Sequence, residues 1–149
     1  MRFLIQRVSR ASVRVDGELV ASIGAGILAL VGIAATDSAK DADYLAEKLV
    51  NLRIFPDENG KMNLSALNCG AELLLVSQFT LYGDCRKGRR PGFDAAASPA
   101  VAQELYEYVV AKVREKGLKT LTGVFQAHME VELVNDGPVT FLLVSEPAA

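Results

Sequence analysis

The chain has 149 residues, of which 50% are hydrophobic, and this is enough for one domain with its own core and too little for two ordinary domains. With 16 Lys and Arg against 18 Asp and Glu, the formal net charge is −2. This charge excludes a protein that coats a nucleic acid along its whole length, but it permits a local basic patch that grips one end of an RNA.

The sequence carries no targeting or metal-binding signal. Its first residues, MRFLIQRV, lack the long apolar region and the cleavage site of a secretory signal peptide. No apolar run reaches the roughly 20 residues that a membrane span needs, and Cys69, Cys85 and one histidine are too few and too scattered for a zinc site. We therefore expect a cytoplasmic protein with reduced thiols, no membrane association, no metal and no cofactor.

The first third of the chain is predicted to be mostly β-structure. Apolar and polar residues alternate from 1 to 23, and Asp16-Gly17 is a strong signal for a two-residue hairpin. Residues 26–33 are nearly all apolar, which suits a strand that is buried on both faces. From 36 to 52 the apolar period becomes helical behind a polar start that can cap a helix.

The middle of the chain is predicted to hold one strong strand between two loops. A turn at 57–60 separates two short extended pieces, 53–56 and 61–64. The most apolar segment, 73–82, is expected to be a strand, and the polar stretch 83–92 that follows it is expected to be a loop.

A second helix is marked at both ends. Ser98 is its expected N-cap, Pro99 its first residue, and Gly117 the residue that stops it. Its apolar face is expected to be formed by Val101, Leu105, Tyr108 or Val109, and Val113.

Three further strands, 120–126, 128–134 and 139–145, are expected to end the chain, the last two joined by a turn at 135–138. About eight strands and two main helices in one domain, 1–149, predict an α+β fold. We expect a barrel-like or sandwiched sheet, antiparallel or mixed, that the helices cover.

The first candidate site is the polar run Ser77-Gln78-Phe79-Thr80 in the predicted strand 73–82. Three of these four residues are polar in an otherwise apolar strand, and an unpaired polar group costs roughly 1–3 kcal/mol when it is buried. The side chains therefore either find polar partners in a buried site or lie where the strand emerges at the sheet edge. The local sequence leaves both interpretations open.

The second candidate site is Asn135-Asp136-Gly137-Pro138. Gly-Pro steps are common in turns, and this one is typical of an ordinary hairpin turn. A cis Gly137–Pro138 bond would turn the backbone sharply and could aim neighbouring carbonyls at a ligand, although only about 5–6% of such bonds in folded proteins are cis.

A conventional catalytic triad is not expected. His128 is the one histidine, so a Ser-His-Asp or Cys-His hydrolase would have to use it. Neither Gly-x-Ser-x-Gly nor HExxH is present. His128 is interpreted as a structural or solvent-facing residue, and Cys85 as a bystander thiol.

The loop at 86–90 has four cations in five residues: Arg86, Lys87, Arg89 and Arg90. Such a cluster could hold a phosphodiester backbone through charge-assisted hydrogen bonds. It could equally be a solvated surface loop. These four residues are therefore candidate RNA contacts.

Together these segments resemble the D-aminoacyl-tRNA deacylase family over essentially the whole chain. Two motifs carry the resemblance, Ser77-Gln78-Phe79-Thr80-Leu81 and Asn135-Asp136-Gly137-Pro138-Val139-Thr140, with the Arg-Pro loop and Phe125-Gln126-Ala127-His128-Met129 between them. Either motif alone would be weak, whereas both in this order make a specific match. The resemblance implies a cytoplasmic homodimeric ester hydrolase that frees D-amino acids from mischarged tRNA, a step of chiral proofreading in translation quality control.

The resemblance also implies an active site at the subunit interface. Ser77, Gln78, Phe79 and Thr80 would form the catalytic floor of a pocket for the terminal adenosine and its esterified amino acid. Gly137-Pro138, in cis, would enter from the partner subunit. Its carbonyls would accept a hydrogen bond from the α-ammonium and leave no room for the Cβ of an L-residue. Glycine has no Cβ, so glycyl-tRNA mischarged on tRNA-Ala is an expected second substrate.

Further roles follow from the same resemblance. Arg7 would lock the Gly-Pro segment in its orientation, while Phe125 and Met129 would shape the wall near the adenine. Backbone amides of Phe79 and Thr80 are candidates for stabilising the oxyanion, each worth roughly 3–4 kcal/mol when well placed. Thr80 could act as a nucleophile, but no base is evident near it. The scarcity of titratable residues in both motifs favours assistance by the substrate 2′-hydroxyl, with the protein mainly positioning the reactants.

Three rival functions are weighed against this one. A binding module on tRNA or another nucleic acid would keep the fold without hydrolysis. A general esterase or peptidase using Ser77 or Cys85 would cleave small esters and react with serine or thiol reagents. In a purely structural dimer, Ser77, Gln78 and Thr80 would only satisfy one another, and Gln78→Ala would cost stability alone.

Overall fold

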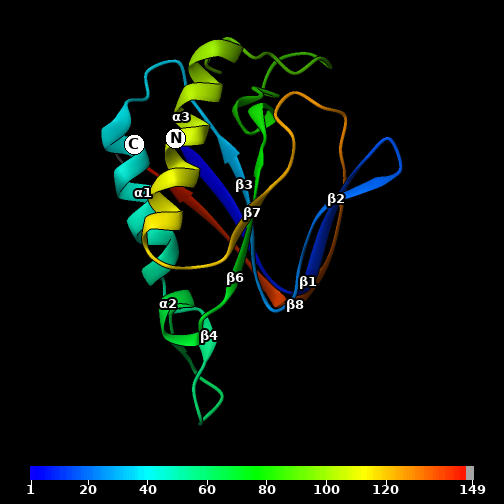
Figure 1. Cartoon of the computed structure of the whole chain (residues 1–149). Coiled ribbons are helices and arrows are strands. Elements are labelled where there is room, and N and C mark those ends of the chain that lie inside the picture. Colours follow the sequence, from blue (N-terminus) through cyan, green and yellow to red (C-terminus); the bar gives the residue numbers. More distant parts are fainter. Residues whose placement is uncertain (147–149) are drawn as a thin grey trace.

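One six-stranded sheet organises the fold in the computed structural model, which describes residues 1–146 (Figure 1). The strands follow the order β2-β1-β3-β6-β7, and β8 also pairs with β1. The strands of this sheet are β1 Arg2–Val15, β2 Glu18–Ile23, β3 Gly26–Gly32, β6 Glu72–Ser77, β7 Thr120–Thr122 and β8 Glu130–Val144. Strand β1 is antiparallel to β2, β3 and β8, whereas β6 is parallel to both β3 and β7.

The length of β1 makes the sheet curl. Its residues 2–8 pair with β3 and its residues 11–15 with β2, while β8 pairs along most of its length. Strand β2 also contacts β6 and β7, so the sheet comes close to closing on itself. The hairpin between β1 and β2 turns at Asp16 and Gly17, both at positive φ, as the sequence predicts. The predicted α+β class with a barrel-like sheet is confirmed.

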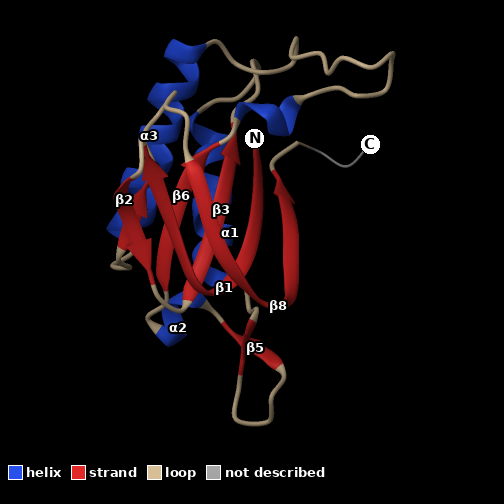
Figure 2. Cartoon of the chain, turned by 90° about the vertical axis from the view of Figure 1, so that its right-hand side faces the viewer, coloured by secondary structure: helices blue, strands red, loops and turns tan. Residues whose placement is uncertain are grey.

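The helices lie on one face of the sheet. Helices α1 (Ala39–Asn51) and α3 (Pro99–Glu115) pack against each other, and Figure 2 shows them behind the strands. The remaining elements are short: β4 Phe55–Pro56, β5 Met62–Leu64, α2 Ala66–Cys69 and the 3-10 helix η1 Phe79–Tyr82. Strands β4 and β5 form a hairpin that projects from the base of the molecule (Figures 1 and 2). No helix in the described part of the chain has the length and apolar character needed to cross a membrane.

The two predicted helices form with the predicted end signals. Ser38 begins α1, and its amide donates to the Asp41 carboxylate at 2.9 Å. Ser98 and Pro99 begin α3, and Gly117 follows its end with φ +91°. The apolar face predicted for α3 is wrong at its start, because Val101 is 42% exposed. The residues of α3 that are buried are Ala102, Tyr106, Val109, Val110 and Val113.

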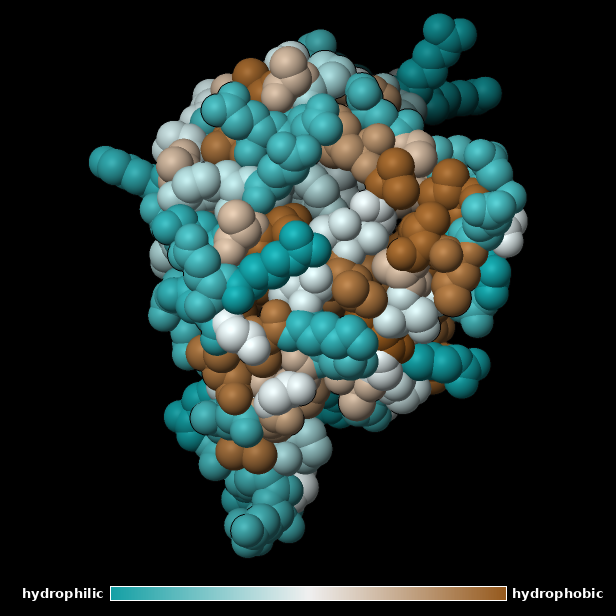
Figure 3. Space-filling view, viewed as in Figure 1, coloured by the Kyte–Doolittle hydropathy of each residue, from teal (hydrophilic) through white to brown (hydrophobic). Residues whose placement is uncertain are grey.

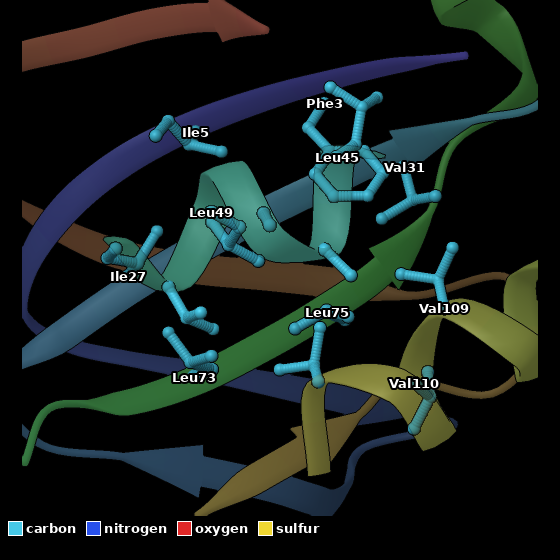
Figure 4. Close-up of a cluster of buried hydrophobic side chains, with 14 of the residues drawn as sticks. Phe3, Ile5, Ile27, Val31, Leu45, Leu49, Leu73, Leu75, Val109 and Val110 are labelled. Atoms are coloured by element: carbon cyan, nitrogen blue, oxygen red, sulfur yellow. The ribbon is translucent and has the colours of Figure 1, made fainter. Parts of the chain in front are cut away.

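Both faces of the central strands are buried. Ile27, Val31, Leu73 and Leu75 point toward α1 and α3 and converge with helix side chains such as Leu45 (Figure 4). A second cluster fills the inside of the curled sheet and is made of Val8, Ala11, Val13, Ala21, Ile23, Leu28, Leu74 and Val76. Each fully buried Leu, Ile or Val contributes about 1.5–3 kcal/mol relative to exposure. The expectation that 26–33 is buried on both faces is therefore confirmed.

Four predicted elements differ from the structure. The strand expected at 73–82 ends at Ser77, and the chain then turns into η1. The strand expected at 120–126 is formed only over Thr120–Thr122. The two strands expected at 128–134 and 139–145 are one strand, β8, with a bulge opposite residues 6–10 of β1. Helix α2 was not predicted.

Candidate active site

A pocket of about 640 Å³ opens where β6 ends. One side of it is the end of β6 with the start of η1, and the others are the segment before α3 and the segment between β7 and β8. Five of the predicted site residues line it: Ser77, Gln78, Phe79, Phe125 and Met129. Figure 3 shows that hydrophobic residues gather on the right-hand side of this face, where the segment between β7 and β8 runs in Figure 1.

The polar run lies at the end of its strand. The Gln78 amide donates to the Val31 carbonyl at 2.8 Å, and the chain then turns into η1. The Gln78 side chain donates to the Thr80 hydroxyl, which places Thr80 beside the pocket lining. Ser77 and Gln78 are partly buried, and Phe79 and Thr80 are exposed. The run therefore combines both interpretations of the sequence, since Gln78 and Thr80 are partnered with each other and the run stands where the strand emerges.

The first two amides of η1, those of Phe79 and Thr80, have no backbone acceptor outside the helix among the described residues. Amides at the start of a helix have no partner within the helix, so they are available to an acceptor. The two groups suit the role of oxyanion donors that the sequence predicts for them.

Helix η1 is held at its far end by a cluster that the sequence did not predict. Arg2 donates to the Leu81 carbonyl at 3.1 Å, and its guanidinium lies 4.5 Å from the centre of the Tyr82 ring. The Tyr82 hydroxyl donates to Glu146. Burial, and then this hydrogen bond, raise the pKa of Tyr82 above its ordinary value. These contacts fix the turn that carries the two amides.

An aromatic pair stands at the mouth of the pocket. The rings of Phe79 and Phe93 lie 5.0 Å apart with an interplanar angle of 58°. A Cβ on Gly83 would lie 3.1 Å from the Phe93 ring, so the glycine permits this close approach. Phe93 was not among the predicted site residues, because it lies in a loop with no apolar period of its own.

The segment between β7 and β8 forms the opposite wall. The Phe125 ring packs against Tyr106, with centroids 6.1 Å apart. The Met129 sulfur accepts a hydrogen bond from the Val124 amide at 3.4 Å. It also packs so closely on Gly123 that a Cβ at this position would lie only 2.6 Å from the sulfur. Met129 and Phe125 thus both line the pocket, and Met129 also fixes the position of this wall.

His128 lines the pocket and is exposed, which agrees with a solvent-facing residue. Cys69 and Cys85 are both free and exposed, and neither belongs to the pocket. Among residues 1–146 there is no group of three or more His, Cys, Asp or Glu arranged to hold a metal.

The Gly137–Pro138 bond is cis, and the two residues are exposed. The Asn135 side chain holds the segment: its amide donates to the carbonyls of Arg7 at 2.9 Å and of Val139 at 3.0 Å. Its oxygen accepts from the Val139 amide at 3.3 Å. The segment is therefore a fixed bulge in β8 and not the free turn between two strands that the sequence predicts.

Arg7 supports the same bulge from β1. Its Nε donates to the Asp136 carbonyl at 2.9 Å and lies 3.2 Å from the Asp136 carboxylate. Its Nη1 donates to the Ile54 carbonyl at 2.6 Å, and only 12% of the side chain is exposed. Arg7 thus has the contacts that the predicted locking role requires.

The two motifs lie at opposite ends of the sheet. Ser77 pairs with Val31 near the end of β3. Asn135 pairs with Val8 of β1, and Val8 pairs with Gly26 at the start of β3. Five residues of strand separate the two positions on β3, which corresponds to about 16 Å. Within one chain, the Gly-Pro segment therefore does not reach the pocket.

The basic loop divides into one paired cation and three unpaired ones. Arg86 donates to Asp84 from Nε at 2.9 Å and from Nη2 at 2.8 Å. The side-chain hydrogen bond from Arg86 lowers the pKa of Asp84 to about 2. Lys87, Arg89 and Arg90 are exposed and form no ion pair with other described residues. Long hydrophilic side chains project at the upper right of Figure 3, where this loop lies in Figure 1.

Comparison with known proteins assigns this fold, with its pocket at the end of β6, to the deacylases that act on aminoacyl-tRNA. Residues 4–144 match the family model described as D-Tyr-tRNA(Tyr) deacylase. A D-aminoacyl-tRNA deacylase of Koribacter versatilis (strain Ellin345) is 62% identical over 146 residues, 98% of each chain. One of Clostridioides difficile (strain 630) is 57% identical over 97% of each chain. The chain belongs to this deacylase family, and the expectation of an enzyme that hydrolyses an aminoacyl-tRNA ester is confirmed.

Solved structures share the fold. A chain titled c-Myc DNA Unwinding Element Binding Protein has a TM-score of 0.92 and 40% identity, with 99% of this chain and 100% of that chain covered. A probable eukaryotic D-amino acid tRNA deacylase has a TM-score of 0.84 at 18% identity, with coverages of 95% and 97%.

Proposed function

We propose that this protein hydrolyses the ester bond between a D-amino acid and the terminal adenosine of tRNA, and that it does so in the cytoplasm, where charged tRNA is used. The observation that carries the proposal is the pocket at the end of β6, which gathers Ser77, Gln78, Phe79, Phe125 and Met129 in a chain of the deacylase family. Water adds to the ester carbonyl and the bond to the ribose oxygen breaks, so that free amino acid and tRNA are released.

The active form is a homodimer. The Gly137-Pro138 segment is exposed and held rigidly, yet it lies at the opposite end of the sheet from the pocket of its own chain. A second copy related by a twofold axis can bring this segment to the pocket of the first, and the first can do the same in return. The separation of the rigid, exposed Gly-Pro segment from the pocket of its own chain supports this arrangement.

Backbone carbonyls of the Gly-Pro segment then act as a chiral gate. They accept a hydrogen bond from the substrate α-ammonium and occupy the space that the Cβ of an L-residue would need. Glycine passes the gate, so glycyl-tRNA mischarged on tRNA-Ala is a second substrate. Because the selecting atoms belong to the backbone, D-residues with different side chains are accepted.

The chemistry relies on positioning. The amides of Phe79 and Thr80 stabilise the oxyanion, worth roughly 3–4 kcal/mol for each well-placed donor. The Thr80 hydroxyl already accepts a hydrogen bond from Gln78, and no described titratable group bonds to it. It therefore has no base to activate it as a nucleophile. The ribose 2′-hydroxyl of the substrate assists the reaction in its place, and Ser77 and Gln78 position the ester.

The test compares hydrolysis of D-tyrosyl-tRNA and L-tyrosyl-tRNA by the purified protein and by Thr80→Ala. Release of D-tyrosine with an intact L-ester supports the deacylase and its gate, and activity retained in Thr80→Ala supports substrate assistance. Cleavage of both esters would refute the gate. If small esters without RNA are cleaved, and serine or thiol reagents stop the reaction, a general esterase replaces the proposal.

A nucleic-acid-binding module is the second candidate. The solved relative with 40% identity is titled as a DNA-unwinding-element binding protein, and Lys87, Arg89 and Arg90 stand unpaired in the basic loop. This candidate predicts binding of uncharged tRNA or DNA with both tyrosyl esters left intact.

A further inference from the structure

Gln126 adopts a backbone conformation that ordinarily belongs to glycine. Its φ is +62°, and among residues 1–146 only Asp16 shares a positive φ without being glycine. Asp16 lies in a two-residue hairpin, where Asp is a favoured residue. Gln126 lies in the segment between β7 and β8, and a side chain in this region of φ is sterically disfavoured because of its Cβ. The conformation therefore needs a reason that the turn itself does not supply.

The surroundings of Gln126 fix its place. The Ala127 amide donates to the Val124 carbonyl at 3.2 Å, so residues 124–127 form a closed turn. The Val124 amide is in turn bonded to the Met129 sulfur, which packs over Gly123. Gln126 is thus held at the pocket by contacts on both sides of it.

The side chain of Gln126 forms no hydrogen bond within residues 1–146. It is exposed and lines the pocket. Phe125, Ala127 and Met129 around it present apolar surface. Strained residues that the fold does not need for packing tend to occur at ligand sites. A glycine would serve the turn better, so the benefit of glutamine lies in what its carboxamide offers to a ligand.

We infer that Gln126 is a specificity-determining residue whose carboxamide binds the edge of the terminal adenine of tRNA. The amide oxygen accepts from the 6-amino group of the base, and the amide nitrogen donates to an adjacent ring nitrogen. This two-bond pairing is the usual match between glutamine and adenine. The apolar wall of Phe125 and Met129 covers the face of the base, and Gln126 reads its edge. The inference rests on the proposed function, because it assigns one end of that substrate to this wall.

Two ligands that cannot be hydrolysed test the pairing. They are 3′-deoxy-3′-(D-tyrosylamino)adenosine and the same amide on purine riboside, which lacks the 6-amino group. Titration calorimetry on the wild-type protein is expected to give about tenfold tighter binding of the adenosine ligand. Gln126→Gly is expected to bind both ligands equally and weakly, and its Tm is expected to rise by about 2–4 °C because the strain is relieved.

Gln126→Glu tests the hydrogen bonds without changing the size of the side chain. The variant keeps an oxygen that accepts a hydrogen bond and loses the amide N–H groups that donate one. It is expected to keep the preference for the adenosine ligand, because its oxygen still accepts from the 6-amino group, and to bind both ligands more weakly, because the ring nitrogen loses its donor. Gln103→Glu on the exposed face of α3, away from the pocket, is the matched control and is expected to bind both ligands as wild type does. A tenfold preference that survives in Gln126→Gly, or one that disappears in Gln126→Glu, would overturn the inference.

The same measurements distinguish a failure of the proposed function from a failure of the role assigned to Gln126. If the wild type binds neither ligand and leaves D-tyrosyl-tRNA intact, the deacylase is refuted and the role of Gln126 with it. If it cleaves D-tyrosyl-tRNA but binds the adenosine and purine ligands equally, only the role of Gln126 is refuted.

Discussion

Arg7 on β1 and Asp136 on β8 are joined by a hydrogen bond of 2.9 Å from the Arg7 Nε to the Asp136 carbonyl, one residue before the Gly-Pro step. The same guanidinium also binds the Ile54 carbonyl at 2.6 Å, so one planar group sets the position of the bulge relative to the β4–β5 hairpin. Lysine has a single rotating ammonium and cannot hold two carbonyls in this fork geometry.

Arg7→Lys is therefore expected to lower kcat/KM for D-tyrosyl-tRNA by about tenfold or more and to weaken the discrimination against the L-ester. The loss of stability is expected to be only about 1–2 kcal/mol. Arg10→Lys, at an exposed position of the same strand, is the control and should match wild type. Equal rates for Arg7→Lys and wild type on both esters would show that Arg7 does not govern the gate.

Gly32 sets how closely η1 approaches β3. A Cβ on Gly32 would lie 2.9 Å from the Leu81 Cβ and 3.2 Å from the Gln78 carbonyl oxygen. Gly32→Ala is therefore expected to push η1 outward, lowering kcat through misplaced amides and costing about 1–3 kcal/mol of stability. A Cβ on Gly92 would meet only the Asp84 carbonyl oxygen, at 3.9 Å, so Gly92→Ala is the control. Kinetics and urea unfolding measure the two effects, and an unchanged kcat in Gly32→Ala would contradict this account.

The unpaired cations of the basic loop are expected to bind tRNA phosphates. Replacing Arg89 and Arg90 with Gln should raise KM for D-tyrosyl-tRNA and reduce the slope of log KM against log salt by about 1–2. Arg86→Gln should change the slope less, because Asp84 already neutralises this cation. D-tyrosyl-adenosine, which has no phosphates, serves as the control substrate. A slope that none of these variants changes would mean that the loop is simply solvated.

Tyr106 should make the stability sensitive to alkaline pH. Burial raises the pKa of Tyr106 to about 12, from an ordinary value near 10. The unfolded chain therefore loses this proton first, and the stabilisation that is complete below pH 10 is lost as pH rises from 10 to 12, by about 2 kcal/mol. Tyr106→Phe is expected to lose this part of the pH dependence.

The same variant also loses the hydrogen bond from the Tyr106 hydroxyl to the Leu75 carbonyl, 2.8 Å long, at a cost of about 1 kcal/mol at neutral pH. The difference in unfolding free energy between wild type and Tyr106→Phe should therefore fall from about 1 kcal/mol in favour of wild type below pH 10 to about 1 kcal/mol in favour of Tyr106→Phe at pH 12. Tyr44→Phe, at an exposed position of α1, should run parallel to wild type. A constant difference across this pH range would refute the assignment.

The sequence predicts the elements whose signals are local. The ends of α3 follow from Ser98, Pro99 and Gly117, and the first hairpin follows from Asp16-Gly17. Each of these signals acts through the conformation of a few neighbouring residues. The site residues at the pocket were predicted from the two motifs and the resemblance that they carry.

The differences arise where distant contacts decide. The apolar run 73–82 has no local reason to stop at Ser77, and it turns because Gly32 of β3 admits Leu81. The segment at 135–138 has the composition of a turn, yet β1 continues past it and keeps both sides of the bulge in one strand. For α2, the signals were present in Ser65, which caps the helix, and in Gly70 at φ +63°, but four residues give no apolar period to find.

The hydrogen bond from the Val124 amide to the Met129 sulfur makes the pocket wall sensitive to oxidation. Neither Cys69 nor Cys85 lines the pocket, so the proposed chemistry offers oxidants no catalytic thiol. A thioether converts to a polar sulfoxide, and the added oxygen would disturb the contact of this sulfur with the Val124 amide. Oxidation of Met129 would loosen the wall that carries Gln126 while leaving η1 intact. The damaged protein would then lose its grip on the substrate before it lost its ability to hydrolyse, and enzymatic reduction of the sulfoxide would restore it.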